Sequence, residues 1–463
     1  MKIAFVHYTI GEKDGVNSVI HSNIESLLKQ FSRLRITLVG VIKKKPIRSK
    51  RVDYIDFPEL DISPLKKELF SKEDVFDYMR SGERIYQKLD SLLNNYNVVI
   101  IENPNLGIHP AATYGFYRFA KKNEQSLKKR KVLFRIHDFA EDRRGNFTDI
   151  LKFEGRESSP YWHKIIFPLR RNLSYIVINS TDIRKLKGHG LFEEAKVFYI
   201  PNPVDMDIKY DDINTSMKLR KLLIRKERMN KDALIIYYPV RIVPRKNVEE
   251  AIFLTIYFQY FFKRQFHLLL SLKTDLPEGI EYASKIEDFV KKHKLPVTVG
   301  LNNYVALKRI HKKGNLVKYG VGDVYNICDK VITTSLLEGF GMFFIESWFF
   351  DKAILGRDLP LITPDFKAKG INLEHLYYTL FINNKDYKSY DQKEKFGFIL
   401  KLRDKKFRED FHNENRHSVH GILRFFDPDY EKSIIENNKK QVIKNFSSEA
   451  IARKIMKAIN LTH

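Results

Sequence analysis

The sequence predicts an α/β fold made of two doubly wound parallel-sheet domains. Short β-branched or aromatic runs alternate with longer helical patterns along all 463 residues, which is typical of parallel strands joined by crossover helices. The chain is also long for one hydrophobic core and sufficient for two domains of about 200 residues each. The polar, charged stretch 205–232 separates the two sets of runs, so we place the linker there.

The candidate strands of both halves are short and rich in β-branched and aromatic residues. Such runs are typical of strands that are buried in a parallel sheet. They are residues 3–7, 36–41, 98–102, 132–137, 175–179 and 197–200 in the first half, and 234–240, 267–272, 297–299, 331–334 and 353–355 in the second.

The composition limits the kinds of protein that the chain can be. A single cysteine, Cys328, excludes an intramolecular disulfide and a cysteine-clustered zinc site, and it favours a reducing compartment. The N-terminus, 1–8, has the pattern of a short strand rather than that of a signal peptide. The longest apolar stretch, 251–262, is too short to span a bilayer. We therefore expect a cytoplasmic, soluble enzyme.

The formal net charge of +25 leaves two interpretations open. A positive field of this size attracts polyanions whatever the fold, but it can also follow from a general bias towards Lys, Ile, Asn, Phe and Tyr. The basic run 43–51 is accordingly either a solvated loop or a contact for an anionic surface or ligand. No nucleic-acid-binding motif is recognisable, so we expect no specific nucleic-acid partner, while peripheral contact with an anionic membrane stays open.

Two glutamates eight positions apart, Glu338 and Glu346, mark the predicted functional site. A strand runs into the first, and Gly339 and Gly341 let the backbone bend and approach a ligand. A helix from Met342 would direct free amides at an anion and surround Glu346 with apolar side chains. A carboxylate there needs hydrogen-bond donors. The hydroxyls of a ribose or hexose could supply them, and so could a backbone amide or an arginine in a purely structural role.

This motif, with Gly-Phe-Gly between the glutamates, resembles the site of the retaining glycosyltransferases of family 4, which have the GT-B fold. Four further segments resemble motifs of the family and follow its order along nearly the whole chain. They are the interdomain signature 197–205, the phosphate-binding strand and loop 238–247, the short helix and aspartate 323–329, and the closing helix at 446–450.

The resemblance implies a GT-B architecture, two Rossmann-like domains that face a cleft. The N-terminal, acceptor-side domain would span 1–207, and a last helix that crosses back would complete it with 431–463. The domain that binds the nucleotide sugar would span 208–430. Within it, the polar segment 386–427 is expected to be an exposed helical excursion.

Arg241 and Lys246 are the predicted ligands of a diphosphate. Negative charge grows on a leaving diphosphate as the glycosidic bond breaks, and preorganised cations lower that barrier. These two cations lie five positions apart around a proline-containing loop and align with an Arg and a Lys of the family. Arg245 lies between them and is the alternative assignment. The resemblance further implies that the reaction needs no bound metal or other cofactor.

The resemblance assigns the remaining donor contacts to the glutamate motif. Glu338 would hold the transferred hexose, and Glu346 would hold the ribose. The rest of the donor site would come from the turn between them, with Gly339, Phe340, Gly341 and Met342.

Two further candidates lie in the first domain. Gly15, in the turn after the first strand, would offer a backbone amide to a phosphate or a sugar hydroxyl. The family has two adjacent glycines where this chain has Asp14 and Gly15, so the turn could shape the acceptor pocket instead. His137, at the carboxyl end of the strand 132–137, resembles the family's histidine beside the transferred sugar. The predicted catalytic residues are therefore Glu338, His137, Arg241 and Lys246.

Arginines at the end of the same strand predict the character of the acceptor. Arg135, Arg143 and Arg144 could bind a carboxylate or phosphate through bidentate hydrogen bonds, which suits an acidic acceptor. Glu141 and Asp142 lie in the same loop and could neutralise the arginines instead.

We therefore predict a retaining enzyme that transfers a hexose from a nucleotide-diphosphate sugar to an acceptor. The loop 356–363 departs from the family's usual sequence, which suggests a small acid such as glycerate or glucosylglycerate as the acceptor. Two alternatives stay open: a GT-B sugar-nucleotide epimerase, and a protein that binds nucleic acid or a membrane surface through its charge. The paired glutamates favour transfer over epimerisation.

Overall fold

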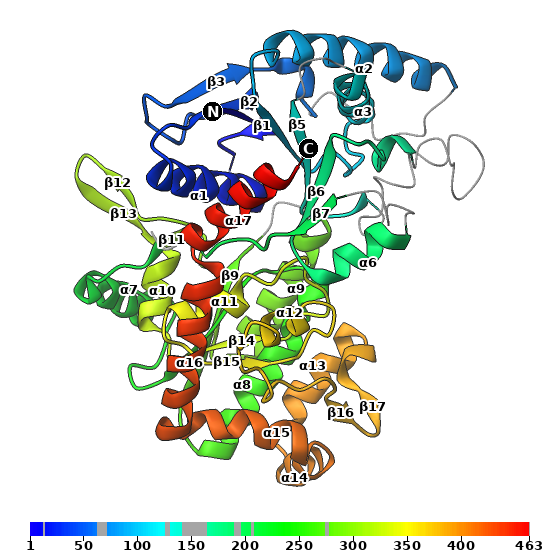
Figure 1. Ribbon diagram of the computed structural model, residues 1–463. Helices are drawn as coiled ribbons and strands as arrows, with labels where there is room; N and C mark the ends of the chain where they lie inside the picture. The colour runs from blue at the N-terminus through cyan, green and yellow to red at the C-terminus, as the bar shows by residue number, and fades with distance from the viewer. Residues whose placement is uncertain are drawn as a thin grey trace. The chain divides into compact units, whose positions relative to one another are not determined.

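The computed structural model describes residues 1–12, 14–62, 72–125, 130–140, 164–188, 196–204, 208–273 and 277–462. The chain folds into two compact units (Figure 1). Unit 1 comprises Met1–Pro203 and Phe446–His463, and unit 2 comprises Val204–Asn445. The C-terminal segment that belongs to unit 1 is therefore shorter than the expected 431–463.

Unit 1 contains a seven-stranded parallel sheet with the order β3-β2-β1-β4-β5-β6-β7. All six predicted strands are present, and only β3 was missed. That strand lies at the edge of the sheet and is mostly half-exposed or exposed, so its sequence mixes polar and apolar residues. The strands are β1 (Lys2–Ile10), β2 (Arg35–Ile42), β3 (Val52–Asp56), β4 (Val98–Glu102), β5 (Lys131–Ile136), β6 (Leu173–Val177) and β7 (Lys196–Tyr199).

Both faces of this sheet are covered by helices, which explains why its central strands are apolar without alternation. The helices of unit 1 are α1 (Gly15–Gln30), α2 (Lys72–Leu92), α3 (Pro110–Gln125), α6 (Ser180–Gly188) and α17 (Ser448–Leu461). Successive side chains of β1 point to opposite faces. Phe5 packs in the hydrophobic cluster of α1 and α17, and Val6 packs in that of α2 and α3.

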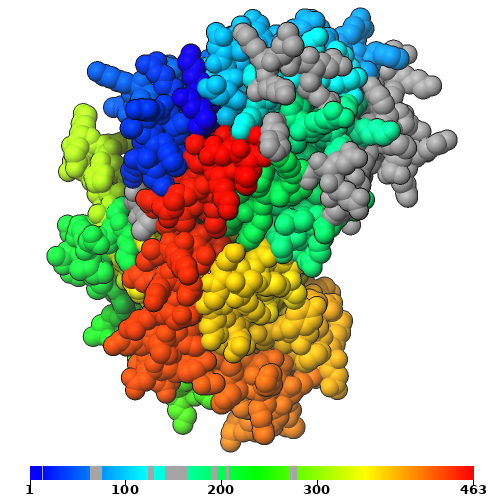
Figure 2. Space-filling model, in the orientation of Figure 1, coloured from blue at the N-terminus to red at the C-terminus, as the bar shows by residue number. Residues whose placement is uncertain are grey.

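The C-terminal helix α17 packs beside α1, and both views show the last segment of the chain against the first (Figures 1 and 2). Ile451, Ile455 and Ile459 share one buried cluster with Ile24 and Leu27 of α1. The core of unit 1 is thus completed by residues from the far end of the chain.

The single last helix expected over 431–463 is instead two helices. Helix α16 (Pro428–Phe446) ends before Ser447, whose backbone is extended (φ −62°, ψ 151°). The Ser447 hydroxyl accepts a hydrogen bond from the amide of Ala450 (3.2 Å) and caps α17. A serine in this role begins a new helix, and the chain passes from unit 2 to unit 1 at this break.

Unit 2 contains a five-stranded parallel sheet with the order β10-β9-β8-β14-β15. All five strands were predicted. They are β8 (Leu234–Arg241), β9 (Phe266–Leu272), β10 (Val297–Val299), β14 (Lys330–Thr333) and β15 (Ile354–Gly356). A small sheet of β11 (Val305–Ala306), β12 (Ile310–Lys312) and β13 (Asn315–Gly320), and a pair of β16 (Phe381–Ile382) with β17 (Lys385–Asp386), were not predicted.

The helices of unit 2 separate its strands and follow them. They are α7 (Ile213–Lys226), α8 (Val248–Phe262), α9 (Pro277–His293), α10 (Val321–Ile327), α11 (Phe343–Phe349), α12 (Thr363–Lys367), α13 (Gln392–Lys401), α14 (Lys405–Glu414), α15 (Arg416–Leu423) and α16. The helix α7 lies within the polar, charged stretch 205–232 where the linker was expected.

The prediction that 386–427 is helical is confirmed, but the segment is not an exposed excursion. The helices α13 to α15 bury Phe398 and Phe411, and a short helical turn after them buries Phe425. The ring of Phe411 packs edge-on against Phe253 of α8, with 4.9 Å between the ring centroids. The apolar residues of this segment are few, but their helical spacing gathers them on one face.

Candidate active site

The predicted diphosphate loop lies at the carboxyl end of β8, where ligands bind in parallel α/β sheets. Arg241 is the last residue of β8, and a single 3₁₀ turn, Pro244–Lys246, leads to α8. The Tyr238 hydroxyl donates to the carbonyl of Lys246 (2.8 Å), and Thr334 Oγ1 donates to the carbonyl of Asn247 (2.9 Å). The loop backbone is therefore fixed from two neighbouring strands.

Lys246 and Glu338, predicted on separate motifs, are in direct contact. Lys246 Nζ donates to Glu338 Oε1, and Ser335 Oγ donates to the same oxygen (2.7 Å). Lys246 is 5% exposed. Burial lowers the pKa of its ammonium to about 8, and the charge of Glu338 opposes that shift. The ion pair joins the loops that follow the carboxyl ends of β8 and β14. The two main motifs predicted to bind the nucleotide sugar therefore form one site.

Arg241 and Arg245 differ in their partners. Arg241 is exposed and forms no ion pair with any residue that the structure describes. Arg245 donates to the carbonyl of Leu337 (2.9 Å), and its Nη1 lies 3.6 Å from Glu338 Oε2. Arg245 thus supports the loop that carries Glu338, whereas Arg241 presents its guanidinium to solvent at the sheet edge.

The glycine turn after Glu338 has the predicted form. Gly341 has φ +78°, and a Cβ there would lie 2.8 Å from Ile362 Cδ1, so only glycine fits without strain. Gly339 is exposed and Phe340 is buried. The helix α11 begins directly after Met342, as expected.

Glu346 has the hydrogen-bond donor that its apolar surroundings require. The Tyr325 hydroxyl donates to Glu346 Oε2 (3.1 Å). Tyr325 is buried and stacks on Phe350 with 4.3 Å between the ring centroids. Glu346 is half-buried, so Tyr325 orients its carboxylate without enclosing it. Sequence reasoning recognised the segment of Tyr325 but not this role.

In unit 1, His137 forms a buried hydrogen bond with a carboxylate that the sequence did not predict. His137 Nε2 lies 2.6 Å from Oε2 of Glu102, the last residue of β4. Glu102 is fully buried. Burial alone would raise the pKa of Glu102, but the hydrogen bond with His137 and the charge of Arg135 outweigh it and lower the pKa. In the sequence, the feature that could have indicated this partner is a glutamate at the end of an apolar strand.

Arg135 is not placed for a direct contact with an acceptor. It is 1% exposed, and its Nη2 donates to Asn202 Oδ1 (3.4 Å). Its charge instead stabilises the carboxylate of Glu102. Arg143 and Arg144 lie outside the described residues, as do Glu141 and Asp142, so the roles predicted for them remain predictions.

Gly15 is the first residue of α1, and the side chain of Asp14 caps this helix. Asp14 Oδ1 accepts from the amide of Asn17 (2.8 Å), and its Oδ2 accepts from the side-chain amide of Asn17 (2.7 Å). Gly15 is exposed, and a Cβ there would meet no atom within 4 Å. The carboxylate of Asp14 places a negative charge beside the amide of Gly15, which disfavours a diphosphate at this turn.

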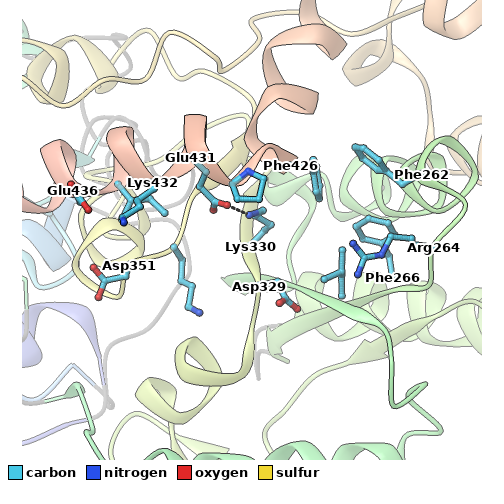
Figure 3. Close-up of a pocket in the computed structure, with 14 residues that line it drawn as sticks. Phe262, Arg264, Phe266, Asp329, Lys330, Asp351, Phe426, Glu431, Lys432 and Glu436 are labelled. Atoms are coloured by element: carbon cyan, nitrogen blue, oxygen red, sulfur yellow. Dashed lines mark hydrogen bonds and ion pairs between the residues drawn. The ribbon is translucent and has the colours of Figure 1, made fainter.

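A hollow at the opposite edge of the unit 2 sheet does not belong to this site (Figure 3). It encloses about 590 Å³ where β8 and β14 begin, and Leu234 and Lys330, their first residues, line it. An ion pair between Lys330 and Glu431 of α16 crosses it.

Within the described parts of the chain, no group of three or more His, Cys, Asp or Glu side chains is arranged to hold a metal ion. Among the same residues, no helix is long and apolar enough to cross a membrane.

No protein-family model matches the chain. The chain is 29% identical over 384 residues to mannosylglucosyl-3-phosphoglycerate synthase of Petrotoga mobilis, covering 80% of this chain and 67% of the relative. It is 24% identical over 403 residues to mannosylglucosylglycerate synthase of the same organism, covering 81% and 86%. A solved glycosyltransferase structure from Rickettsia africae has a TM-score of 0.60 at 14% identity, covering 99% of this chain and 97% of that chain.

Fold and sequence relatives agree on the class of protein. The chain has the GT-B fold, and it is a glycosyltransferase.

Proposed function

We propose that this glycosyltransferase belongs to family 4 and transfers a hexose, with retention of the anomeric configuration, from a nucleotide-diphosphate sugar to a small anionic acceptor. The observation that supports this most directly is the contact between Lys246 and Glu338, with Arg241 at the same sheet edge. A cation for a diphosphate and a carboxylate for sugar hydroxyls are thereby adjacent, as transfer from a nucleotide sugar requires.

Four of the predicted donor residues then have a chemical role. Arg241 and Lys246 stabilise the charge that develops on the departing diphosphate. Glu338 accepts hydrogen bonds from the hexose, and Glu346, oriented by Tyr325, accepts them from the ribose. These cations take the place of a metal ion, so the reaction proceeds without one.

His137 completes the proposed catalytic set from unit 1. Glu102 accepts from His137 Nε2, so the carboxylate fixes the orientation of the imidazole. The other ring nitrogen, Nδ1, is then left as the hydrogen-bond acceptor for a hydroxyl of the transferred hexose.

The acceptor is proposed to carry a phosphate or carboxylate. The name of the 29% identical relative describes a product with a 3-phosphoglycerate part. In this chain, Lys43 and Lys44 are exposed directly after β2. Their amides both donate to the carbonyl of Ile10 (2.9 and 3.2 Å) at the carboxyl end of β1. We assign the anionic group of the acceptor to these two lysines, because they stand at the ligand-binding edge of the sheet.

The proposed setting is the cytoplasm, where sugar nucleotides and phosphorylated acids are available. Contact with an anionic membrane surface is peripheral in this proposal and depends on the net charge of +25.

A transfer assay tests the proposal. The purified chain is incubated with UDP-, GDP- and ADP-hexoses, each with glucosyl-3-phosphoglycerate or glucosylglycerate, and the products are identified by mass spectrometry and NMR. We expect one donor to give a hexosylated acid whose new bond keeps the donor's anomeric configuration. Glu338→Gln is the inactive control. A hexose epimer formed without any acceptor would instead indicate a sugar-nucleotide epimerase.

The lysine assignment is tested by a double variant in the same assay. We expect Lys43→Ala/Lys44→Ala to raise the KM for the phosphorylated acceptor about tenfold, because each charge-assisted contact contributes about 1.5–3 kcal/mol when shielded and less when exposed. The KM for the donor should not change. Lys50→Ala, in the same basic run, is the matched control, and an equal effect of both variants would contradict the assignment.

A further inference from the structure

The helix α8, which follows Lys246, begins with two buried carboxylates. Glu249 is 2% exposed and Glu250 is fully buried. A buried carboxylate is strongly unfavourable unless its oxygens receive hydrogen bonds. Apolar residues at these positions would pack against the sheet without that requirement, so the partners of the carboxylates indicate what they are for.

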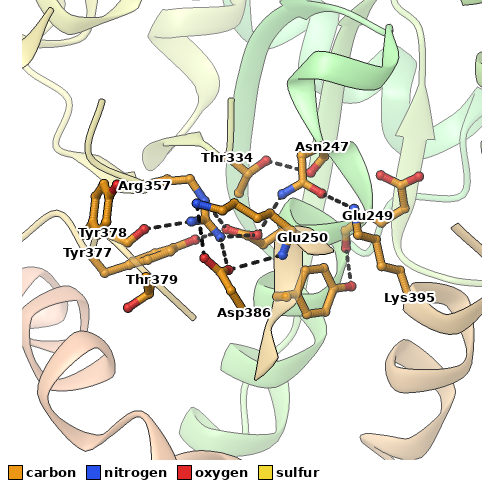
Figure 4. Close-up of polar contacts among 12 residues, drawn as sticks. Asn247, Glu249, Glu250, Thr334, Arg357, Tyr377, Tyr378, Thr379, Asp386 and Lys395 are labelled. Carbon is orange, nitrogen blue, oxygen red and sulfur yellow. Dashed lines mark hydrogen bonds and ion pairs between the residues drawn. The ribbon is translucent and has the colours of Figure 1, made fainter. Parts of the chain in front are cut away.

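Four hydrogen bonds reach the two oxygens of Glu250 (Figure 4). Oε1 accepts from the Tyr377 hydroxyl (2.6 Å) and from Arg357 Nε (3.1 Å). Oε2 accepts from Arg357 Nη2 (2.7 Å) and from Asn247 Nδ2 (2.7 Å). The carboxylate is therefore satisfied, and its geometry is set by a bidentate guanidinium.

Arg357 is held as firmly as its partner. It is 3% exposed, and its Nη1 donates to the carbonyl of Tyr378 (2.7 Å). Its Nη2 also lies 3.4 Å from Asp386. Burial alone would lower the pKa of Arg357, but the charge of Glu250 outweighs it and raises the pKa. The Arg357 guanidinium therefore stays charged, and its hydrogen bonds to Glu250 fix the carboxylate in place.

Asn247 connects this network to the donor site. Its backbone is left-handed (φ 47°, ψ 51°), a conformation that asparagine adopts more readily than most side chains do. Its side chain is held at both ends, because Nδ2 donates to Glu250 and Oδ1 accepts from Lys395 Nζ (2.8 Å). The preceding residue is Lys246, so the direction of the Lys246 side chain depends on this turn.

Arg357 also contacts the strand that leads to Glu338. Its amide donates to the carbonyl of Thr333, the last residue of β14 (2.8 Å). One residue therefore bonds through its backbone to the Glu338 side of the donor site and through its guanidinium to the Lys246 side.

We infer that Arg357, Glu250, Tyr377 and Lys395 are positioning residues of the donor site, which fix Asn247 and thereby hold Lys246 where it meets the diphosphate. None of the four contacts the donor in this scheme. The inference rests on the proposed function, since it assumes that Lys246 binds a nucleoside diphosphate.

Variants that each remove one hydrogen bond test the inference while preserving the fold. Tyr377→Phe removes a donor to Glu250, and Lys395→Met removes the donor to Asn247. Tyr257→Phe is the matched control. Tyr257 is a buried tyrosine of α8, the helix that carries Glu250, and its hydroxyl contacts His412 Nδ1 (2.7 Å). Affinities for UDP, GDP and ADP are measured by calorimetry, with kcat and both KM values from the transfer assay.

We expect Tyr377→Phe and Lys395→Met each to weaken binding of the preferred nucleoside diphosphate about five- to tenfold and to raise the donor KM similarly. The acceptor KM should not change. Lys395→Arg, which keeps a cationic donor, should restore most of the affinity. Tyr257→Phe should bind the nucleotide as the wild type does, even if its melting temperature falls.

Two outcomes would overturn the inference, and they are distinguishable. If the wild type binds a nucleoside diphosphate and both variants bind it equally well, the network serves stability alone and the inference is wrong. If the wild type binds none of the three nucleotides, the proposed function fails and the inference fails with it.

Discussion

At the scale of single residues, Lys246 gives the donor site a pH dependence. Burial is the largest cause that lowers its pKa to about 8, with Arg245 and Arg241 adding to the shift and Glu338 opposing it. A bound diphosphate favours the ammonium form, so binding takes up a proton wherever free Lys246 is neutral. The terminal phosphate of a nucleoside diphosphate is ionised above about pH 7.5, and we expect the affinity for it to fall about tenfold per pH unit above pH 8.

Calorimetry in buffers of different ionisation enthalpy checks this prediction, because it reports the protons taken up on binding. Lys246→Arg, whose guanidinium stays charged, should bind with an affinity that does not change between about pH 7.5 and 9.5. An equally flat profile for the wild type would show that the diphosphate does not meet Lys246.

Glu102 allows a second prediction at this scale. Its pKa is lowered on folding from its ordinary value of 4.5, so it contributes stability above that pH and loses it as the pH falls through the folded value. Glu102→Gln should therefore lower the free energy of unfolding by about 2 kcal/mol at pH 7. The difference from the wild type should shrink below about pH 4. The variant Glu102→Gln should also reduce turnover about tenfold, because His137 loses the charge that orients it.

Urea unfolding at the two pH values and the kcat of the variant provide the measurement. Glu59→Gln is the control in the same unit, since Glu59 forms an exposed ion pair with Lys88 and such pairs contribute at most about 1 kcal/mol. If Glu102→Gln unfolds like the wild type at pH 7, the buried pair with His137 has no net effect.

At the scale of elements, α17 is the segment whose loss should damage unit 1 most. Ile455 is buried between α17 and α1. We expect Ile455→Ala to lower the free energy of unfolding by about 2–4 kcal/mol, through lost burial and the cavity that remains. Lys457→Ala, on the exposed face of the same helix, should change it by less than about 0.5 kcal/mol.

Denaturant unfolding gives the free energies of unfolding of the two variants. Hydrogen exchange reports amide protection separately for each unit. Protection should fall first in α1 and β1, which share the cluster of Ile455. A loss confined to unit 2 would contradict the assignment of α17 to unit 1.

The elements also show how far the sequence could be interpreted. Most strands of the two main sheets are buried and largely apolar, so eleven of them were recognisable from the sequence. The edge strand β3 was not, because its half-exposed positions accept polar residues. The break at Ser447 was missed because one capping serine interrupts an otherwise continuous helical pattern.

The residues of the candidate site also fall into two groups, those that the sequence indicated and those that it did not. The glutamate motif, Arg241 and Lys246 are local patterns, and the structure brings Lys246 and Glu338 into contact. The partners that fix them are distant in sequence: Glu250 and Arg357 are 107 positions apart, and Glu102 and His137 are 35 apart. Such pairs depend on strand order, which spacing in one sequence does not reveal.

At the scale of the whole molecule, the net charge of +25 and the donor site should respond differently to salt. Exposed charges are screened within about 10 Å at 0.1 M salt, whereas buried charges are screened much less. Lys246, at 5% exposure, belongs to the second kind. We expect the chain to bind vesicles with anionic lipids at about 20 mM salt and to be released at about 200 mM, while affinity for the nucleoside diphosphate falls less than about threefold.

Vesicle sedimentation and calorimetry on the same samples measure the two affinities, with neutral vesicles as the control. Binding that survives at high salt, or that extends to neutral vesicles, would require apolar contact with the bilayer and would contradict a purely electrostatic association.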